Sequence, residues 1–197
     1  MVYPPAKKNH FDTEKFTDLT RQATTAGFVV SYADHRAFSP AELIELSTIP
    51  GLVAKNWCID QKRVFFTGHS DGGTVSMALA FMGGTKHIPA ATAPSAAGIR
   101  GADLAGRKCP APIPVMVMHS TNDTLFPGYG METNLWWASC NQCDLNSTET
   151  LDNGCISYNG CANDVQVLYC EGNGSHAEWP GVNDATIDFF TQSASKN

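Results

Sequence analysis

The feature that most constrains the fold of this chain is a glycine-rich pentapeptide, Gly68–Gly72 (GHSDG), with Ser70 at its centre. The apolar run Val64–Thr67 precedes it, and a run of small and apolar residues, Thr74–Met82, follows it. Glycines are needed where a buried strand turns sharply into a helix, because side chains on either side of the serine would collide with the turn. We therefore expect a strand, a tight turn and a helix in succession, with the Ser70 hydroxyl raised above the edge of a sheet. The alternative is an ordinary turn in which Ser70 only caps the helix.

Short apolar runs alternate with segments of helical periodicity along the rest of the chain. The apolar runs predict strands at 28–32, 64–67, 90–93, 114–118 and 165–169. The predicted helices are 11–26, a helix opened by Ser39 and Pro40, and 74–82, 131–138 and 183–192. Strands that alternate with helices form parallel sheets buried on both faces, which explains why they are continuously apolar. We expect an α/β protein with a mostly parallel sheet of at least five strands, flanked by helices.

Length and charge exclude several classes of protein. A chain of 197 residues suits a single domain over 1–197. The formal net charge is -6 and no basic cluster is present, so we expect no nucleic-acid partner. No apolar run reaches the length of a membrane span, so we expect no membrane partner. The first residues, Met1–Pro5, lack the apolar segment of a signal peptide.

Seven cysteines are many for this length, and five of them lie between 140 and 170. Clustered cysteines in polar, loop-rich sequence favour disulfides, so we expect a secreted or periplasmic protein and a disulfide-tied loop over 140–164. A zinc site at Cys140 and Cys143 is the rival interpretation, but no second pair of ligands follows, and we expect no metal. A redox pair is disfavoured because these cysteines lie far from the first βα turn. The pairing cannot be deduced, and the odd number leaves one thiol free or bonded between chains.

A serine hydroxyl becomes a good nucleophile only when a base takes its proton. In folds with this kind of turn, the acid and then the histidine follow the serine along the chain, each after a strand. Asp123 follows the strand 114–118, and His176 lies in a glycine-rich loop after the strand 165–169. The N–H of Asp71, first in its helix, is the natural donor to an oxyanion. Taken singly, Asp123 also fits a turn residue and His176 a surface histidine.

Three segments together resemble the conserved blocks of a known family. They are 64–73 (VFFTGHSDGG), 117–127 (VMHSTNDTLFP) and 171–181 (EGNGSHAEWPG). They look like the three blocks of the feruloyl esterase / polyhydroxybutyrate depolymerase-like family of α/β-hydrolases, which includes carbohydrate esterases. The resemblance runs from about Phe28 to the C-terminus and implies the α/β-hydrolase fold.

The resemblance also implies roles for individual residues. Ser70 would be the nucleophile, Asp123 the acid, His176 the base and Asp71 an oxyanion donor. Trp179 would line the acyl or alcohol pocket near the histidine. No metal or organic cofactor is required for such a mechanism.

We place further aromatic and histidine side chains at the substrate pocket. Phe126 and His69 join Trp179 as its expected substrate-binding residues. Trp136 and Trp137 are two more candidates, with ordinary core packing as the alternative.

The chain also departs from the family pattern. Ser120 stands where the family has glycine, and one extra residue precedes Trp179. The family has early strands and a loop before the first helix that donates the second oxyanion N–H. We find no counterpart, so we expect the chain to lack N-terminal strands and to leave a sheet edge open.

These observations lead to one expected function and three alternatives. We expect a serine carboxylic-ester hydrolase that forms an acyl-enzyme on feruloyl or acetyl esters of plant polysaccharide. The first alternative is a depolymerase of short-chain polyesters of the polyhydroxybutyrate type. The second is a weakly active or inactive hydrolase-like domain that binds carbohydrate or a partner, as the missing oxyanion loop suggests. A serine peptidase would use the same three residues.

Overall fold

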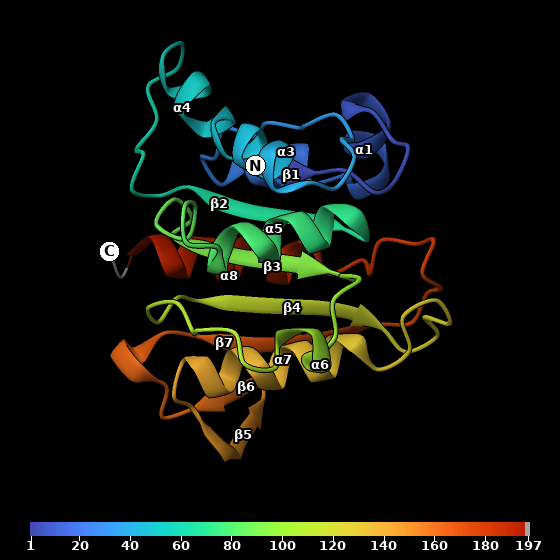
Figure 1. The fold of residues 1–197 in the computed structure, drawn as a ribbon, viewed down its shortest axis with the longest axis vertical. Helices are drawn as coiled ribbons and strands as arrows, with labels where there is room; N and C mark the ends of the chain where they lie inside the picture. Colours follow the sequence, from blue (N-terminus) through green and yellow to red (C-terminus); the bar gives the residue numbers. More distant parts are fainter. Residues whose placement is uncertain (196–197) are drawn as a thin grey trace.

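The computed structural model describes residues 1–195, which form a seven-stranded sheet with helices on both faces (Figure 1). The strands lie in the order β1-β2-β3-β4-β7-β6-β5. Their bounds are β1 (Val2–Tyr3), β2 (Phe65–His69), β3 (Ala91–Ser95), β4 (Val115–Ser120), β5 (Asp144–Thr150), β6 (Ile156–Asn159) and β7 (Val167–Gly172). The helices are α1 (His10–Thr17), α2 (Thr20–Thr25), α3 (Pro40–Ser47), α4 (Ile49–Ala54), α5 (Asp71–Phe81), α6 (Gly101–Leu104), α7 (Tyr129–Cys140), α8 (Asn183–Ser195) and the 3-10 turn η1 (Ala162–Asp164).

The core of the sheet is parallel, as the alternating pattern predicts. Strands β1, β2, β3, β4 and β7 pair in parallel, and only β6 and β5 run antiparallel. Side chains of β4 show why these strands are apolar throughout. Val115 and Val117 pack into the cluster that contains Trp137 of α7, whereas Met116 and Met118 pack on the opposite face. Both faces of the strand are therefore buried, and a continuous apolar run is required.

The carboxyl ends of the central strands meet at one edge of the sheet. Residue pairing aligns His69 of β2 with Ser95 of β3, and Ser95 with Met118 of β4. Ser120, the last residue of β4, aligns with Gly172 of β7. The loops that leave these strands consequently emerge side by side, which is where open α/β sheets gather their functional residues.

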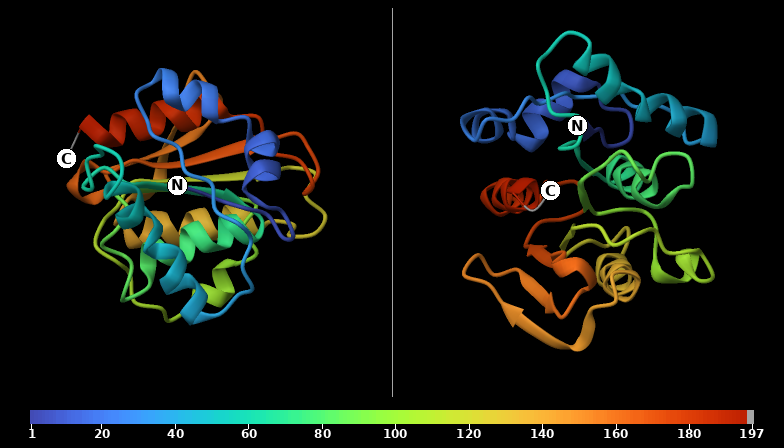
Figure 2. Two further views of the ribbon diagram at one scale, coloured as in Figure 1. Left: turned by 90° about the horizontal axis from the view of Figure 1, so that it is seen from above. Right: turned by 90° about the vertical axis from the view of Figure 1, so that its left-hand side faces the viewer.

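Helices cover the two faces of the sheet in separate layers (Figure 2). Helix α5 packs on β1, β2 and β3, and α7 packs on β4 and β7. Helix α8 lies on the opposite face, where Phe189 and Phe190 join Phe65 in one apolar cluster. None of the helices within residues 1–195 has the length and apolar character that a membrane span requires.

The N-terminal part differs from the sequence-based expectation in two ways. The helix predicted over 11–26 is divided into α1 and α2, because Asp18 adopts a left-handed backbone (φ 49°) that ends the first helix. The strand predicted at 28–32 is reduced to a single bridge between Tyr32 and Val2. The neighbouring strand β1 is only two residues long, so it offers almost no ladder for pairing.

Strand β1 was not predicted, and it changes the expectation of an open edge next to β2. Val2 pairs with Thr67 and Tyr3 with Gly68, so β1 covers part of that edge of the strand that leads to Ser70. The Tyr3 side chain is completely buried against Phe66. Two residues are too few to produce a periodic pattern, and the strand exists because β2 supplies its partner.

The disulfide-tied loop predicted over 140–164 contains strands that were not predicted. This stretch contains the β5–β6 hairpin, which extends the sheet through β6 and β7. Its outer strand β5 is polar and almost wholly exposed, so no buried face imposes an alternating pattern. The stretch is nevertheless tied by disulfides, as expected. The bonded pairs are Cys109–Cys140, Cys143–Cys161 and Cys155–Cys170, and Cys58 is free and exposed.

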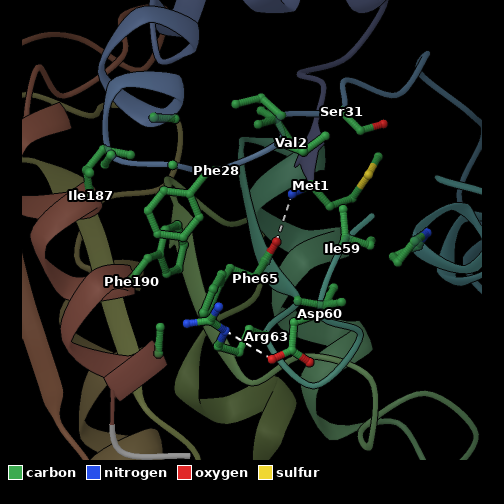
Figure 3. Close-up of a pocket in the computed structure, with 18 of the residues that line it drawn as sticks. Met1, Val2, Phe28, Ser31, Ile59, Asp60, Arg63, Phe65, Ile187 and Phe190 are labelled. Carbon is green, nitrogen blue, oxygen red and sulfur yellow. Dashed lines mark hydrogen bonds and ion pairs between the residues drawn. The ribbon is translucent and has the colours of Figure 1, made fainter. Parts of the chain in front are cut away.

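A pocket of about 510 Å³ lies between the start of β1, the start of β2 and helix α8 (Figure 3). Its walls are mainly apolar, with Phe28, Phe65 and Phe190 prominent among them. The Met1 amine donates a hydrogen bond to the Phe65 carbonyl at 2.8 Å, and burial lowers the pKa of this amine to about 5. The pocket adjoins the amino end of β2, whereas Ser70 follows the carboxyl end of that strand.

Candidate active site

Ser70 occupies a strained turn between β2 and α5. Its backbone has φ 56° and ψ -115°, a conformation that residues with a side chain rarely adopt. The strain is maintained because β2 and α5 are both fixed by burial, so the residue between them has no freedom to relax. The predicted strand, tight turn and helix are confirmed.

Close approach of backbones explains the surrounding glycines. A Cβ at Gly72 would collide with the main chain of Tyr3 and Pro4, and one at Gly68 would collide with the carbonyls of Tyr3 and Gly72. A Cβ at Gly73 would collide with the Ser95 carbonyl of β3. The glycines therefore let α5 begin directly against β1 and β3.

The structure brings Ser70, Asp123 and His176 together from three separate strand ends. His176 Nε2 lies 2.9 Å from Ser70 Oγ, and His176 Nδ1 lies 2.7 Å from Asp123 Oδ2. An ionised carboxylate can only accept, so the Nδ1–H donates to Asp123 and Nε2 is left to accept from the serine hydroxyl. In its neutral form, His176 therefore has the tautomer that can take a proton from Ser70.

Asp123 is held by more than the histidine. Its Oδ1 accepts the backbone N–H groups of Leu125 and Phe126, each at 2.9 Å. His119 Nε2 lies 3.6 Å from Oδ2 and donates to the Phe126 carbonyl at 3.0 Å. Burial opposes ionisation, but the hydrogen bonds from His176 and Phe126 outweigh it and hold the pKa of Asp123 below its ordinary value. The carboxylate therefore stays charged when the active site is at neutral pH.

The loop that carries His176 is fixed on both sides. On one side, Glu178 accepts hydrogen bonds from the Ser175 backbone N–H (2.9 Å) and hydroxyl (2.7 Å), which lower the pKa of Glu178. On the other side, Asn122 donates to the Asn173 carbonyl at 2.8 Å. A short turn rather than a free loop therefore presents the histidine.

Comparison with known proteins finds similarity in structure alone. No protein-family model matches the chain, and no curated protein matches its sequence. An acetyl xylan esterase from Aspergillus awamori superposes with a TM-score of 0.72 and 16% identity, over 96% of this chain and 86% of that one. A truncated carbohydrate esterase from gut microbiota superposes with a TM-score of 0.67 and 15% identity, over 98% of this chain and 85% of that one. The fluorophosphonate-binding serine hydrolase FphF of Staphylococcus aureus superposes with a TM-score of 0.64 and 13% identity, over 97% of this chain and 82% of that one.

The chain has the α/β-hydrolase fold. The fold class predicted from the sequence is therefore confirmed, while the identities are too low to show more than the fold. Any activity must therefore be inferred from the side chains around Ser70.

In this fold, the Asp71 N–H belongs to the first residue of α5, and the first N–H groups of a helix have no partner within it. The Asp71 carboxylate lies 2.9 Å from His35 Nε2. The segment after β1 passes against this turn, as the contacts of Gly72 show. Its first two residues, Pro4 and Pro5, have no N–H to donate.

The predicted substrate-binding residues lie in different surroundings. Phe126 packs edge-on against the His176 ring at 4.9 Å, and Trp179 is half-buried with its indole N–H bonded to Asn183 at 2.6 Å. His69 is only 2% exposed and contacts other protein groups through both ring nitrogens. Trp137 lies in the core beneath α7, with Trp136 packed against its ring.

Sequence reasoning missed Phe16 of α1, whose ring lies 5.2 Å from His69 and 6.4 Å from Trp179. Its helical spacing indicated only an apolar face of α1, and the contact depends on how α1 packs. Six of the seven cysteines are in disulfides, and residues 1–195 contain no group of three or more His, Cys, Asp or Glu placed to hold a metal ion.

Proposed function

We propose that this α/β-hydrolase cleaves carboxylic esters through an acyl-enzyme on Ser70. The observation that carries the proposal is the pair of hydrogen bonds made by His176, to Asp123 on one side and to Ser70 on the other. A serine held at a strained turn and bonded to an oriented imidazole is the arrangement that nucleophilic acyl transfer requires.

The reaction follows from this geometry. His176 Nε2 takes the hydroxyl proton as Ser70 Oγ attacks the ester carbonyl, and Asp123 stabilises the imidazolium that forms. The Asp71 N–H, assisted by the dipole of α5, stabilises the oxyanion. The tetrahedral intermediate collapses, the C–O bond to the alcohol breaks, and His176 returns the proton to the departing oxygen. Water then repeats the sequence on the acyl-enzyme, releasing the acid and restoring Ser70.

For the substrate we propose acetyl or feruloyl esters of polysaccharide. The loop that carries His176 continues into an open depression lined by Phe16, Trp179 and polar groups of the adjoining segments, which suits an alcohol part too large to be enclosed. The aromatic side chains of Phe126 and Trp179, which pack against the rings of His176 and His69, suit sugar or phenolic rings. The names of the acetyl xylan esterase and the carbohydrate esterase, which share the fold, agree with this substrate class.

The second candidate is a weakly active domain that retains only binding. It is favoured by Pro4 and Pro5, because these residues of the segment that passes the serine turn have no N–H to donate to an oxyanion. Losing one oxyanion donor costs roughly 10²–10³-fold in turnover. Binding of xylo-oligosaccharides without hydrolysis of any ester would favour this candidate.

The first test is hydrolysis of p-nitrophenyl acetate by the wild-type chain and Ser70→Ala. We expect turnover by the wild type and a loss of at least about 10³-fold in the variant, because the nucleophile is removed. A fluorophosphonate probe, which reacts with activated serines, should label Ser70 of the wild type alone. A folded wild type that neither turns over nor labels would contradict the proposal.

The substrate is then tested with a panel of esters at equal concentration. Acetylated xylan and methyl ferulate represent the proposed class, and hydroxybutyrate oligomers represent the polyester alternative. A peptide p-nitroanilide represents the peptidase. Turnover of the polyester or the peptide alone would overturn the proposed substrate while leaving the acyl-enzyme mechanism intact.

A further inference from the structure

His69 precedes the nucleophile in the chain, yet its side chain points into the protein rather than to the solvent. The ring is 2% exposed. Its Nε2 lies 2.7 Å from the main-chain carbonyl of His176, and its Nδ1 lies 2.9 Å from Ser95 Oγ at the end of β3. Both nitrogens of a buried ring are therefore bonded within the site.

The chemistry of the partners fixes the direction of both bonds. A carbonyl oxygen only accepts, so Nε2 carries the proton and donates it to the His176 carbonyl. Nδ1 of the neutral ring must then accept, and the Ser95 hydroxyl donates to it. The two bonds form a short chain from β3 through the turn to the loop of the catalytic histidine.

The ring is kept neutral by its surroundings. Burial lowers the pKa of His69 to about 4, and the hydrogen bond to the His176 carbonyl and the charge of Asp123 offset only part of this effect. Neighbouring His176 and His119 act in the same direction as burial. At neutral pH the ring can therefore both donate and accept, as its two partners demand.

His69 and Ser70 are adjacent, and together they hold His176 at two points. Ser70 meets the imidazole Nε2, while His69 meets the main-chain carbonyl of the same residue. Phe16 and Trp179 pack against the His69 ring with centroid distances of 5.2 Å and 6.0 Å, which limits its movement. The backbone of the loop is thus anchored to the strand that carries the nucleophile.

We propose that His69 is a positioning residue, which fixes the main chain of His176 so that its imidazole stays aligned with Ser70 and Asp123. The proposal rests on the proposed ester hydrolysis for its consequence in turnover, but not for the geometry. It also assigns His69 a role other than contact with substrate. Misplacement of a catalytic group by about 1 Å can cost on the order of 100-fold in rate, so the anchor matters for kcat.

Two amide variants, His69→Gln and His69→Asn, test whether His69 acts by donating a hydrogen bond to the His176 carbonyl or only by being polar. In His69→Gln the amide nitrogen reaches the position of Nε2 and can still donate to the carbonyl. In His69→Asn it reaches only the level of Nδ1. We expect kcat to fall about 10- to 100-fold in His69→Asn with KM changed less than about twofold, and His69→Gln to recover most of the loss.

Ser95→Ala removes the donor that sets the ring tautomer. With Nδ1 unpaired, the Nδ1–H tautomer gains population, and in that form Nε2 meets the carbonyl without a proton. We expect an intermediate fall in kcat, about three- to tenfold, again with little change in KM.

A second measurement does not depend on activity. Ring ¹⁵N shifts of His176 report which nitrogen carries the proton, and we expect a single Nδ1–H form in the wild type and in His69→Gln. In His69→Asn we expect a mixture of tautomers, because the ring loses its alignment with Asp123. Unfolding midpoints in urea are measured for all variants, since a residue that only fills space would change stability and leave kcat of the folded protein unaltered.

The outcomes are distinct. An inactive wild type contradicts the proposed ester hydrolysis, and the ¹⁵N shifts still decide the role of His69. An active wild type whose His69→Asn variant keeps wild-type kcat and a single His176 tautomer overturns the positioning role. Equal losses in His69→Asn and His69→Gln would also overturn it, because the donor at Nε2 would then not be what matters.

Discussion

Ser70 is the residue at which local preference and the fold conflict most strongly. Its positive φ costs on the order of 1–3 kcal/mol and persists only because neighbouring backbones determine it. The glycines around it let β1 and β3 approach closely enough to do so, as the contacts at Gly72 and Gly73 show. The strained conformation of Ser70 therefore depends on the glycines around it.

Replacing Gly72 by alanine tests this view. The new Cβ would meet the main chain of Tyr3 and Pro4, which lie in and after a buried strand and cannot move cheaply. We expect a loss of about 1–3 kcal/mol or more in the free energy of unfolding, together with reduced ester turnover. Urea denaturation and p-nitrophenyl acetate hydrolysis measure the two effects.

The matched control is Gly83→Ala, where a Cβ meets no atom within 4 Å and φ is not in the left-handed region. We expect its unfolding free energy to stay within about 0.5 kcal/mol of the wild type. Equal stability of the two variants would contradict the steric explanation.

At the scale of elements, the β5–β6 hairpin depends on covalent links more than on burial. Its outer strand buries little, whereas Cys155, directly before β6, is bonded to Cys170 of β7. The sequence predicted disulfides here but not strands, because an exposed polar strand has no apolar period to detect. The disulfide pairing could not be predicted either, since it depends on which strands become neighbours.

Removing the Cys155–Cys170 bond tests the contribution of this link. The bond closes a separation of 15 residues, so we expect the double variant Cys155→Ala/Cys170→Ala to lose about 3 kcal/mol of unfolding free energy. Urea denaturation under oxidising conditions measures the loss. The control Cys58→Ser replaces an exposed free thiol and should be close to neutral. An unchanged midpoint in the double variant would show that the Cys155–Cys170 bond adds nothing to the ladder and to the Cys143–Cys161 bond.

At the scale of the whole molecule, buried neutral histidines make stability depend on pH. Burial lowers the pKa of His69 from 6.5 to about 4 and also lowers the pKa of His119. Between these values the unfolded chain binds a proton that the folded protein does not, so acid favours unfolding. The contribution of His69 is fully present above about pH 6.5 and is lost as the pH falls toward 4.

We expect the unfolding free energy of the wild type to fall on the order of 3 kcal/mol between pH 7 and pH 4 through His69 alone. His69→Gln cannot take up this proton, so its stability should fall less over the same range. Urea denaturation of both proteins at several pH values measures the two slopes. Equal slopes would show that the pKa of His69 is the same in the folded and the unfolded protein.

The sequence by itself determined the fold class, the central parallel strands and the three side chains that the structure brings together. Strands buried on both faces must be apolar, and Ser70, Asp123 and His176 each follow such a strand, so both features are visible in a linear pattern. Only the tertiary structure decided strand β1, the β5–β6 hairpin, the disulfide pairs and the bonds of His69. Each of these depends on a partner distant in the chain, and no local pattern records which residue that partner will be.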